Sequence, residues 1–361
     1  MVHARRRAAL RAQLHVHDLD ALLVTDLLNI RYLTGFTGSN AALLVDAGGE
    51  EHTMFCTDGR YDTQSRRQVP DLRRVIERAG DLRLAKGATE RGVGRLGFES
   101  HVVTVDSHLA LAEVTGPHRL RRASRLVEQL RSVKDATEVA ALRAGCAAAD
   151  TALDGLLAAG GLRPGLTERQ VARDLEERMV QAGAAGPSFE TIVATGPNSA
   201  VPHHRPTDAK LQRGDLVKMD FGALVEGYHS DMTRTVVLGA PAEWQRELYD
   251  LVVAAQAVGR DALHPGADVR EVDAVARGVI DGAGRGKEFL HGLGHGVGLQ
   301  IHEAPALSPR GVGTLRAGMT VTVEPGVYLA DRGGVRIEDT LVVSDGEPDL
   351  LTLTTKDLVA V

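Results

Sequence analysis

The sequence predicts two domains, an α/β domain followed by an α+β domain. At 361 residues the chain is longer than one ordinary hydrophobic core supports. Short apolar runs alternate with helix-forming stretches in the first third, whereas long helices and strongly β-like hairpins occupy the rest. We therefore expect an α/β domain at 1–128 and an α+β domain at 129–361.

Composition and charge narrow the class of protein. The hydrophobic share of 43% and charged share of 25% are typical of a soluble globular protein, and no apolar stretch approaches the roughly 20 residues that span a bilayer. A net charge of −6 argues against a nucleic-acid partner. Cys56 and Cys146 are too far apart in sequence for a disulfide or zinc framework and are interpreted as packing residues. We expect a cytoplasmic protein without a membrane or nucleic-acid partner.

The first domain begins with an Arg-rich stretch, 1–14, that predicts a surface helix with Leu10 and Leu14 facing inward. The arginine clusters at 5–7, 66–74 and 119–125 are interpreted as solvated surface. The expected strands are "ALLVTD", "AALLVDA", "HTMFCT" and "RLGFES", each bounded by Gly or Asp. Helix-forming stretches at 61–68 and 106–114 lie between them, which completes the α/β pattern.

The second domain begins with helices whose N-termini have a recognisable signature. Asp135 and Glu138 have capping-box spacing, as do Thr167 and Gln170. Two further helices are expected at 243–263 and 269–281. The runs "ETIVATG", "DLVKMDFGALV", "DMTRTVVLG", "MTVTVEPGVYL" and "GVRIEDTLVV" predict strands.

A first hairpin, "DLVKMDFGALVEGYHSDMTRTVVLG", contains two aspartates. The midpoint of Asp220 and Asp231 falls between Val225 and Glu226, beside the turn signal Glu226-Gly227. Strands paired about that turn would bring the two carboxylates directly opposite one another, with Cβ atoms ~5 Å apart.

A second hairpin repeats the arrangement with glutamates. The midpoint of Glu324 and Glu338 is Asp331, in the turn "ADRGG", so these side chains are also expected to face one another. Arg336 lies two residues before Glu338, on the same strand face. Solvated hairpin carboxylates are the ordinary alternative, but the apolar strands around Asp220 and Glu324 would make an unpaired charge cost several kcal/mol.

Two divalent cations would resolve this electrostatic conflict. Four carboxylates supply four negative charges, and His295 can add a nitrogen ligand. Mixed oxygen and imidazole ligation suits Mn, Co, Fe or Zn rather than Ca. Such a pair can activate a water molecule at neutral pH and polarise a carbonyl, which is the chemistry of amide hydrolysis.

His295 lies in the glycine-rich run "FLHGLGHGVGLQIHEAP". Gly294 and Gly296 flank it, and Gly292 and Gly298 extend the strip. We expect these glycines to let metal and substrate approach the backbone.

The ordered set of acids and histidine resembles a known family. Asp220, Asp231, His295, Glu324 and Glu338, within "GYHSDMTRT", "HGLGHGVGL", "VEPGVY" and "RIED", resemble the pita-bread metallopeptidases, which include methionine aminopeptidase, aminopeptidase P and prolidase. The segments "NIRYLTGFTGSNAALLV" and "TDGRYDTQ" resemble the creatinase-type amino-terminal domain of Xaa-Pro peptidases. The resemblance covers nearly the whole chain and is strongest to short two-domain, PepQ-type cytoplasmic peptidases of bacteria. It implies a creatinase-type α/β domain followed by a pita-bread catalytic domain.

Carried over residue by residue, the resemblance implies a role for each ligand. Asp220 would hold one ion, Asp231 and Glu338 would bridge, and His295 and Glu324 would complete the other shell. The expected cofactors are two divalent ions, with Mn the first choice and Co or Zn as alternatives.

The resemblance also implies catalytic residues beside the metals. Glu324 would shuttle a proton, and His203, His291 and His302 would bind the substrate carbonyl and stabilise the tetrahedral intermediate. Arg336 matches a position near metals and substrate, and Thr233 looks like a residue that orients a ligand. The implied substrate is a proline-containing peptide, whose scissile nitrogen has no hydrogen and must be protonated on departure.

One departure bears on the substrate. In the prolidase pattern an arginine follows "HE-x-P", where this chain has Ala306. A dipeptidase must hold a free carboxylate, and Arg310, or Arg31 of a partner chain, could substitute. We therefore predict an aminopeptidase P that removes the N-terminal residue before proline from longer peptides, with Xaa-Pro dipeptidase (prolidase) as the alternative.

Other members of the fold fit less well. A methionine aminopeptidase has no use for the amino-terminal domain, and creatinase needs no metal. A catalytically silent binding protein would be expected to lose ligand positions, and none is lost here. A homodimer is expected by resemblance.

Overall fold

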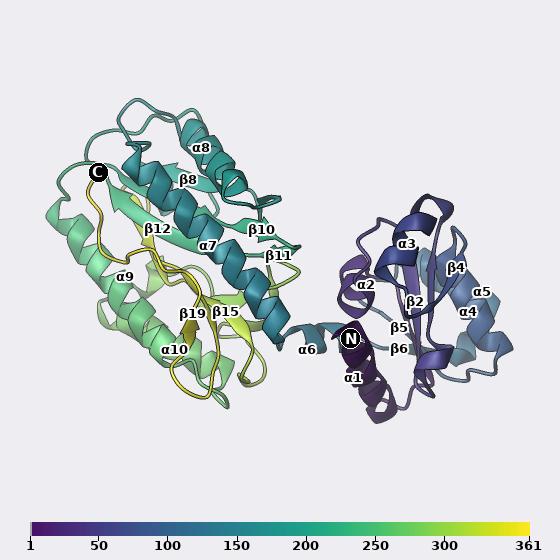
Figure 1. Ribbon diagram of the computed structural model, residues 1–361. Coiled ribbons are helices and arrows are strands. Elements are labelled where there is room, and N and C mark those ends of the chain that lie inside the picture. The colour runs from purple at the N-terminus through teal and green to yellow at the C-terminus, as the bar shows by residue number, and fades with distance from the viewer. Residues whose placement is uncertain (1) are drawn as a thin grey trace. The chain divides into compact units, whose positions relative to one another are not determined.

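The computed structural model describes residues 2–361, and the chain divides into two compact units, Met1–Arg131 and Ser132–Val361 (Figure 1). The first unit is α/β and the second α+β, as the sequence predicted. Within residues 2–361, no helix combines the length and apolar character needed to cross a bilayer.

The first unit is built on one six-stranded mixed sheet in the order β4-β3-β2-β1-β5-β6. The three pairs β1–β5, β5–β6 and β3–β4 are parallel, while β1–β2 and β2–β3 are antiparallel. Its strands are β1 Ala21–Val24, β2 Ala41–Asp46, β3 Met54–Thr57, β4 Arg73–Ile76, β5 Leu96–Phe98 and β6 Leu120–Arg122. Its helices are α1 Val2–Val16, α2 Leu27–Thr34, α3 Asp62–Gln68, α4 Gly80–Glu90, α5 Val105–Thr115 and α6 Leu126–Arg131.

Helix α1 carries both a confirmed and a wrong prediction. Leu10 and Leu14 are fully buried, as the sequence predicted. Arg6 and Arg7 are buried too, so the interpretation of 5–7 as solvated surface was wrong for these two arginines. Arg7 forms ion pairs with Glu50 and Asp71, which lie 43 and 64 residues along the chain. Converging carboxylates make burial of a guanidinium tolerable, and that convergence is not visible in local sequence.

The second unit has long helices around short sheets. Its helices are α7 Ala136–Ala158, α8 Glu168–Gln181, α9 Glu243–Asp261 and α10 Val269–Gly282. Both predicted capping boxes, at Asp135 and Thr167, are present. The strands are β7 Gly186–Pro187, β8 Ile192–Thr195, β9 Leu216–Phe221, β10 Ala223–Val225, β11 Tyr228–His229, β12 Met232–Val237, β13 Gly294–Gly296, β14 Glu303–Leu307, β15 Thr320–Val323, β16 Gly326–Leu329, β17 Gly333–Arg336, β18 Asp339–Val342 and β19 Asp349–Leu350.

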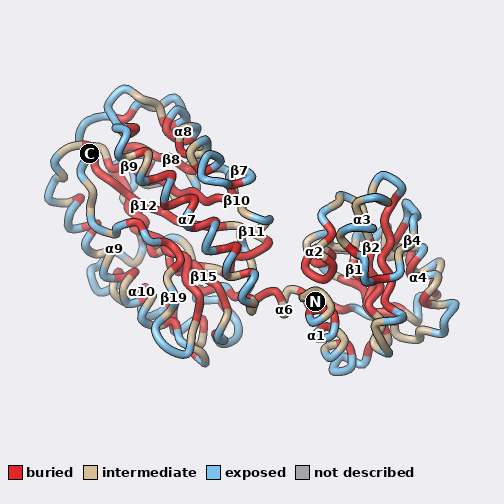
Figure 2. The backbone as a smooth tube through the Cα atoms, viewed as in Figure 1, coloured by how far each residue is buried: buried red, intermediate tan, exposed pale blue. Residues whose placement is uncertain are grey.

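Two hydrophobic cores support the second unit. One joins α7 and α8 to β8, β9 and β12, and the other joins α9 and α10 to β14, β15 and β18. The sheets have the orders β12-β9-β8 and β14-β13-β15-β18-β19, with β16 and β17 forming a separate ribbon. Strands β9, β12 and β15 are buried along their whole length (Figure 2). Asp220 and Asp231 therefore lie beside one of these cores, and Glu324 and Glu338 lie beside the other.

Candidate metal centre

The first carboxylate hairpin differs in register from the prediction. Asp220 pairs with Thr233, so the expectation that Asp220 and Asp231 lie directly opposite was wrong. Glu226 and Gly227, with φ of 51° and 79°, form a two-residue turn centred between them. Left-handed conformations at both central residues favour this tight hairpin. Asp231 consequently lies just before β12, diagonal to Asp220 on the same face, where such neighbours are ~7–8 Å apart.

The second hairpin has the predicted register. Val323 pairs with Asp339 on one side, and Gly326 pairs with Arg336 on the other. The positions between these pairs are Glu324 and Glu338, so they lie opposite one another about Asp331. Neither belongs to a strand: the chain passes there from the β15–β18 ladder to the β16–β17 ladder.

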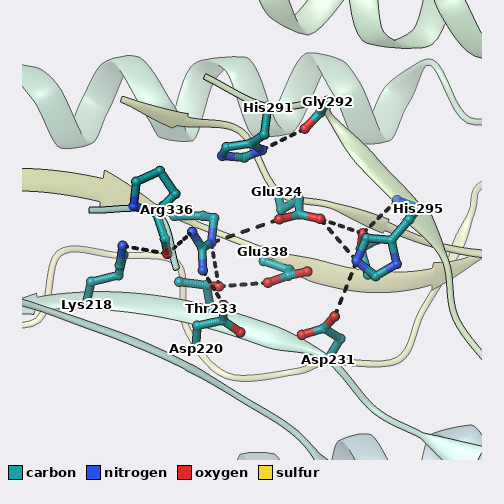
Figure 3. Close-up of polar contacts among 12 residues, drawn as sticks. Lys218, Asp220, Asp231, Thr233, His291, Gly292, His295, Glu324, Arg336 and Glu338 are labelled. Atoms are coloured by element: carbon teal, nitrogen blue, oxygen red, sulfur yellow. Dashed lines mark hydrogen bonds and ion pairs between the residues drawn. The ribbon is translucent and has the colours of Figure 1, made fainter. Parts of the chain in front are cut away.

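The two hairpins and His295 converge on one place (Figure 3). Potential ligand atoms of Asp231, His295 and Glu338 all lie within 4.8 Å of one another. His295 Nε2 is 3.3 Å from Glu324 Oε1 and 3.5 Å from Asp231 Oδ2. Asp220 lies on the opposite side of the cluster, beside Arg336. The structure thus brings together all five residues predicted as metal ligands.

Backbone contacts orient His295 as a ligand. Its Nδ1 is 3.0 Å from the carbonyl oxygen of Gly296. A carbonyl only accepts, so Nδ1 carries the proton and Nε2 presents a lone pair to the carboxylates. The backbone NH of His295 donates to Thr322 Oγ1 at 3.0 Å, and that hydroxyl donates to Glu324 Oε1 at 3.1 Å. One threonine therefore links two of the predicted ligands.

Arg336 is the fully buried cation of the cluster. It forms an ion pair with Asp220, and its Nε donates to Thr233 Oγ1 at 3.0 Å. Thr233 Oγ1 in turn donates to Glu338 Oε2 at 2.7 Å. Thr233 therefore orients Glu338. The sequence analysis had interpreted Thr233 as a residue that orients a ligand.

The charge balance of the cluster fits divalent cations. Burial, reinforced by neighbouring carboxylates, holds the pKa of Asp231 and of Glu338 well above the usual range. Burial also raises the pKa of Glu324 to about 7, against the opposing effect of Arg336. Within residues 2–361, buried Asp220 Oδ1 and Glu338 Oε1 have no hydrogen-bond donor. Orphaned buried oxygens are rare, and metal ions would satisfy both. The residues present therefore fit the divalent ions that their chemistry implies.

A cavity of about 520 Å³ opens onto the cluster. His203 and His302 line it and are exposed, and the His302 ring stacks edge-on against His295 at 4.3 Å between centroids. His204, the neighbour of His203, also lines the cavity, but its Nε2 lies 2.8 Å from Glu168 Oε2. The structure thus separates two adjacent histidines that the sequence distinguished only by resemblance.

His291 lies in the cavity wall with both ring nitrogens engaged. Nδ1 is 2.8 Å from the Gly292 carbonyl, and Nε2 is 2.8 Å from the Tyr328 hydroxyl. Burial and the nearby Arg336 lower the pKa of His291 to about 3, so the ring is neutral. Nδ1 therefore donates and Nε2 accepts from the Tyr328 hydroxyl. The expectation that His291 binds the substrate carbonyl stays a prediction.

Sequence reasoning missed three residues of the centre: Tyr328, Thr322 and Lys218. The Tyr328 hydroxyl accepts from Arg336 Nη1 at 2.9 Å and so links Arg336 to His291. Thr322 lies two residues before Glu324 and Tyr328 four residues after it. Because side chains alternate between the faces of a strand, this even spacing could have indicated that both face the same side as Glu324. Lys218 is fully buried on β9, two residues before Asp220, and so lies on the same face of the strand.

Strand packing requires glycines on both sides of His295, while the expectation that they also let metal and substrate approach the backbone stays a prediction. A Cβ on Gly294 would lie 2.0 Å from the Thr322 carbonyl oxygen, and one on Gly296 would lie 2.3 Å from that of Ala304. Neighbouring backbones already occupy this space, so β13 must be bare for β14 and β15 to approach it.

Comparisons with known proteins agree with this geometry. Residues 140–345 match metallopeptidase family M24, and residues 6–133 match the creatinase/prolidase N-terminal domain. An Xaa-Pro dipeptidase of Pyrococcus furiosus is 33% identical over 95% of this chain and 96% of its own length.

Two solved structures are similar over nearly their whole lengths. An Xaa-Pro dipeptidase from Bacillus anthracis has a TM-score of 0.94 and 36% identity over 99% of this chain and 100% of that one. An X-Pro aminopeptidase from Thermotoga maritima has a TM-score of 0.87 and 32% identity, covering 95% and 98%. The protein therefore belongs to metallopeptidase family M24, as an enzyme with a creatinase-type N-terminal domain and a pita-bread catalytic domain.

Proposed function

We propose that this protein is an Xaa-Pro dipeptidase that uses two divalent ions, preferentially Mn, held by Asp220, Asp231, His295, Glu324 and Glu338. The observation that carries the proposal is the convergence of three buried carboxylates, the half-buried carboxylate of Glu324 and the His295 imidazole beside a cavity. Such ions, when bound, supply Lewis-acid polarisation of the scissile carbonyl and an activated water.

The chain's own residues would bind the substrate and move protons. Within residues 2–361, the His203 side chain has no hydrogen-bond partner, so its ring can donate to a substrate carbonyl in the cavity. His302 is exposed on the same cavity. Glu324 lies between His295 and Arg336, where its carboxylate can accept a proton and return it to the departing proline nitrogen.

The preference for dipeptides needs a group that binds the free carboxylate. Ala306, opposite His295 in β14, cannot do so. Among the described residues, Arg205 is the one arginine that lines the cavity, and Arg310, proposed as a substitute, does not line it. Its Nε is 3.1 Å from Glu190 Oε2 at the same cavity, and both side chains are largely exposed. A substrate carboxylate could therefore replace Glu190 as its partner.

Named relatives also favour the dipeptidase alternative over our prediction of an aminopeptidase P. The Pyrococcus furiosus protein and the Bacillus anthracis structure both bear the name Xaa-Pro dipeptidase. The Thermotoga maritima structure supports aminopeptidase P as the second candidate. The expectation of a cytoplasmic homodimer stays a prediction.

A comparison of substrates tests the proposal. Mn-loaded protein should turn over Leu-Pro with a higher kcat/KM than Arg-Pro-Pro. Arg205→Ala should raise the KM for Leu-Pro more than the KM for the tripeptide. A clear preference for the tripeptide would establish the second candidate instead. If protein reconstituted with Mn, Co or Zn cleaves neither peptide, the enzyme assignment fails and a silent binding protein becomes the better account.

A further inference from the structure

Lys218 is a buried amine that forms no ion pair among the described residues. Its side chain is fully buried on β9, and no carboxylate oxygen of residues 2–361 lies within ion-pair distance of Nζ. Nζ donates instead to the carbonyl oxygens of Val201, at 2.6 Å, and Pro202, at 3.1 Å. Burying an amino group is costly unless it is hydrogen-bonded, and its neighbours Val217 and Met219 on β9 are apolar. Folding of the strand therefore does not explain the lysine.

The two carbonyls that Lys218 holds directly precede His203. The Pro202 carbonyl also accepts from Arg336 Nη1 at 3.1 Å, so two buried side chains, Lys218 and Arg336, hold the same carbonyl oxygen. Figure 3 shows both side chains beside the carboxylate cluster. The His203 ring has no hydrogen-bond partner among the described residues, which leaves its position to the backbone before it. Lys218 Nζ also lies 5.1 Å from the centroid of the buried Tyr328 ring.

We propose that Lys218 is a positioning residue that fixes the Val201–Pro202 backbone and thereby places the His203 ring over the metal centre. The proposal rests on the peptidase function proposed above, because His203 matters only if it contacts a substrate. A purely structural role for Lys218 would predict lower stability without a specific link to His203.

The first test replaces Lys218 by an apolar side chain of similar length. Lys218→Met should lower kcat about 10- to 100-fold, the effect expected of a misplaced catalytic group, with little change in KM or in metal content by elemental analysis. Met219→Leu is the matched control, because Met219 lies on the same strand, is equally buried and faces the opposite side. An unchanged kcat in Lys218→Met would overturn the proposal.

A double-mutant cycle tests whether Lys218 acts through His203. His203→Ala alone should retain metal and sharply reduce kcat. Adding Lys218→Met to His203→Ala should reduce kcat little further, because the side chain to be positioned is already gone. If the fold reduction in kcat of the double variant equals the product of the two single-variant reductions, Lys218 acts independently of His203 and the proposal is wrong.

Hydrogen exchange provides a readout that needs neither metal nor activity. The amides of Val201 and of residues 203–205 in metal-free Lys218→Met should exchange faster than in the wild type, whereas Met219→Leu should not change them. If Lys218→Met does not fold, Lys218→Leu, which also removes the donor, replaces it in every arm. A wild type that cleaves neither Leu-Pro nor Arg-Pro-Pro would defeat the proposed function, while unchanged exchange of 201–205 would defeat this inference alone.

Discussion

The two carboxylate hairpins place their acids differently with respect to the strand ladders. In the second hairpin, Glu324 and Glu338 face one another at a break between ladders, and their backbone NH groups donate to Leu293 and Thr233 outside the hairpin. In the first, Asp231 also stands outside the ladder, just before β12, but Asp220 lies inside β9.

This difference indicates at which backbone positions the fold tolerates clustered negative charge. Three of the four acids occupy ladder breaks, where the backbone can turn the carboxylates towards one space. Asp220, the one inside a strand, faces Thr233 rather than another acid and forms the ion pair with Arg336. Like charges directly opposite destabilise a ladder, so the first hairpin avoids the pairing that symmetry of the sequence had suggested.

The largest expected effect comes from removing an acid at a ladder break. Asp231→Asn should lower kcat/KM by more than about 1,000-fold, because metals supply several kcal/mol of transition-state stabilisation and each 1.36 kcal/mol is tenfold. Metal content by elemental analysis should fall with it. Asp331→Asn is the control, since Asp331 is exposed, has a φ of 59° and asparagine tolerates that conformation. Full metal content in Asp231→Asn would contradict its role as a ligand.

The next effect concerns the strand that brings His295 to the second hairpin. Gly294→Ala should lower the free energy of unfolding by about 3 kcal/mol or more, because its Cβ would lie 2.0 Å from the Thr322 carbonyl oxygen. Gly278→Ala, exposed in α10 with nothing within 4 Å of its Cβ, should instead stabilise by up to about 1 kcal/mol. Denaturant unfolding measures both, and equal stabilities would refute the packing explanation.

The threonines that orient the carboxylates allow a direct comparison of the two hairpins. Thr233→Val removes contacts to both Glu338 and Arg336, so metal affinity should fall about 10- to 100-fold. Thr322→Val removes the 3.1 Å contact to Glu324 and the contact to the His295 backbone NH, neither of which involves Arg336, and should cost less, about 10-fold. Titration of metal-free protein with Mn measures both affinities. A larger loss in Thr322→Val would reverse the ranking.

The smallest effect is a pH dependence of stability in metal-free protein. The folded pKa of Glu324 is raised to about 7, and those of Asp231 and Glu338 are also raised. A raised carboxyl pKa stabilises the fold when the group is protonated, and this contribution is lost as pH rises from the unfolded pKa towards the folded one. The Tm of chelator-treated protein should therefore fall between about pH 5 and pH 8, and added Mn should abolish the decline. A Tm that rises with pH after chelation would be inconsistent with this charge balance.

Much of the fold could be predicted because its signals are local. Capping boxes at Asp135 and Thr167, and the turn at Asp331, depend on residues a few positions apart. The first hairpin differs from the prediction by one residue at its centre, because its turn is centred between Glu226 and Gly227 rather than at the midpoint of the two aspartates.

The sequence by itself determined the two-domain order, the elements that carry the candidate ligands and, through resemblance, which residues those ligands are. Only the tertiary structure shows that His291 Nε2 is hydrogen-bonded to Tyr328 and that Lys218 donates to the backbone before His203. It also shows why β13 needs glycines, because neighbouring backbones fill the space that a Cβ would take. The physical reason is sequence distance. Thr233 and Glu338, for example, are 105 residues apart yet share a hydrogen bond, and periodicity along a strand cannot show which distant backbone will approach it.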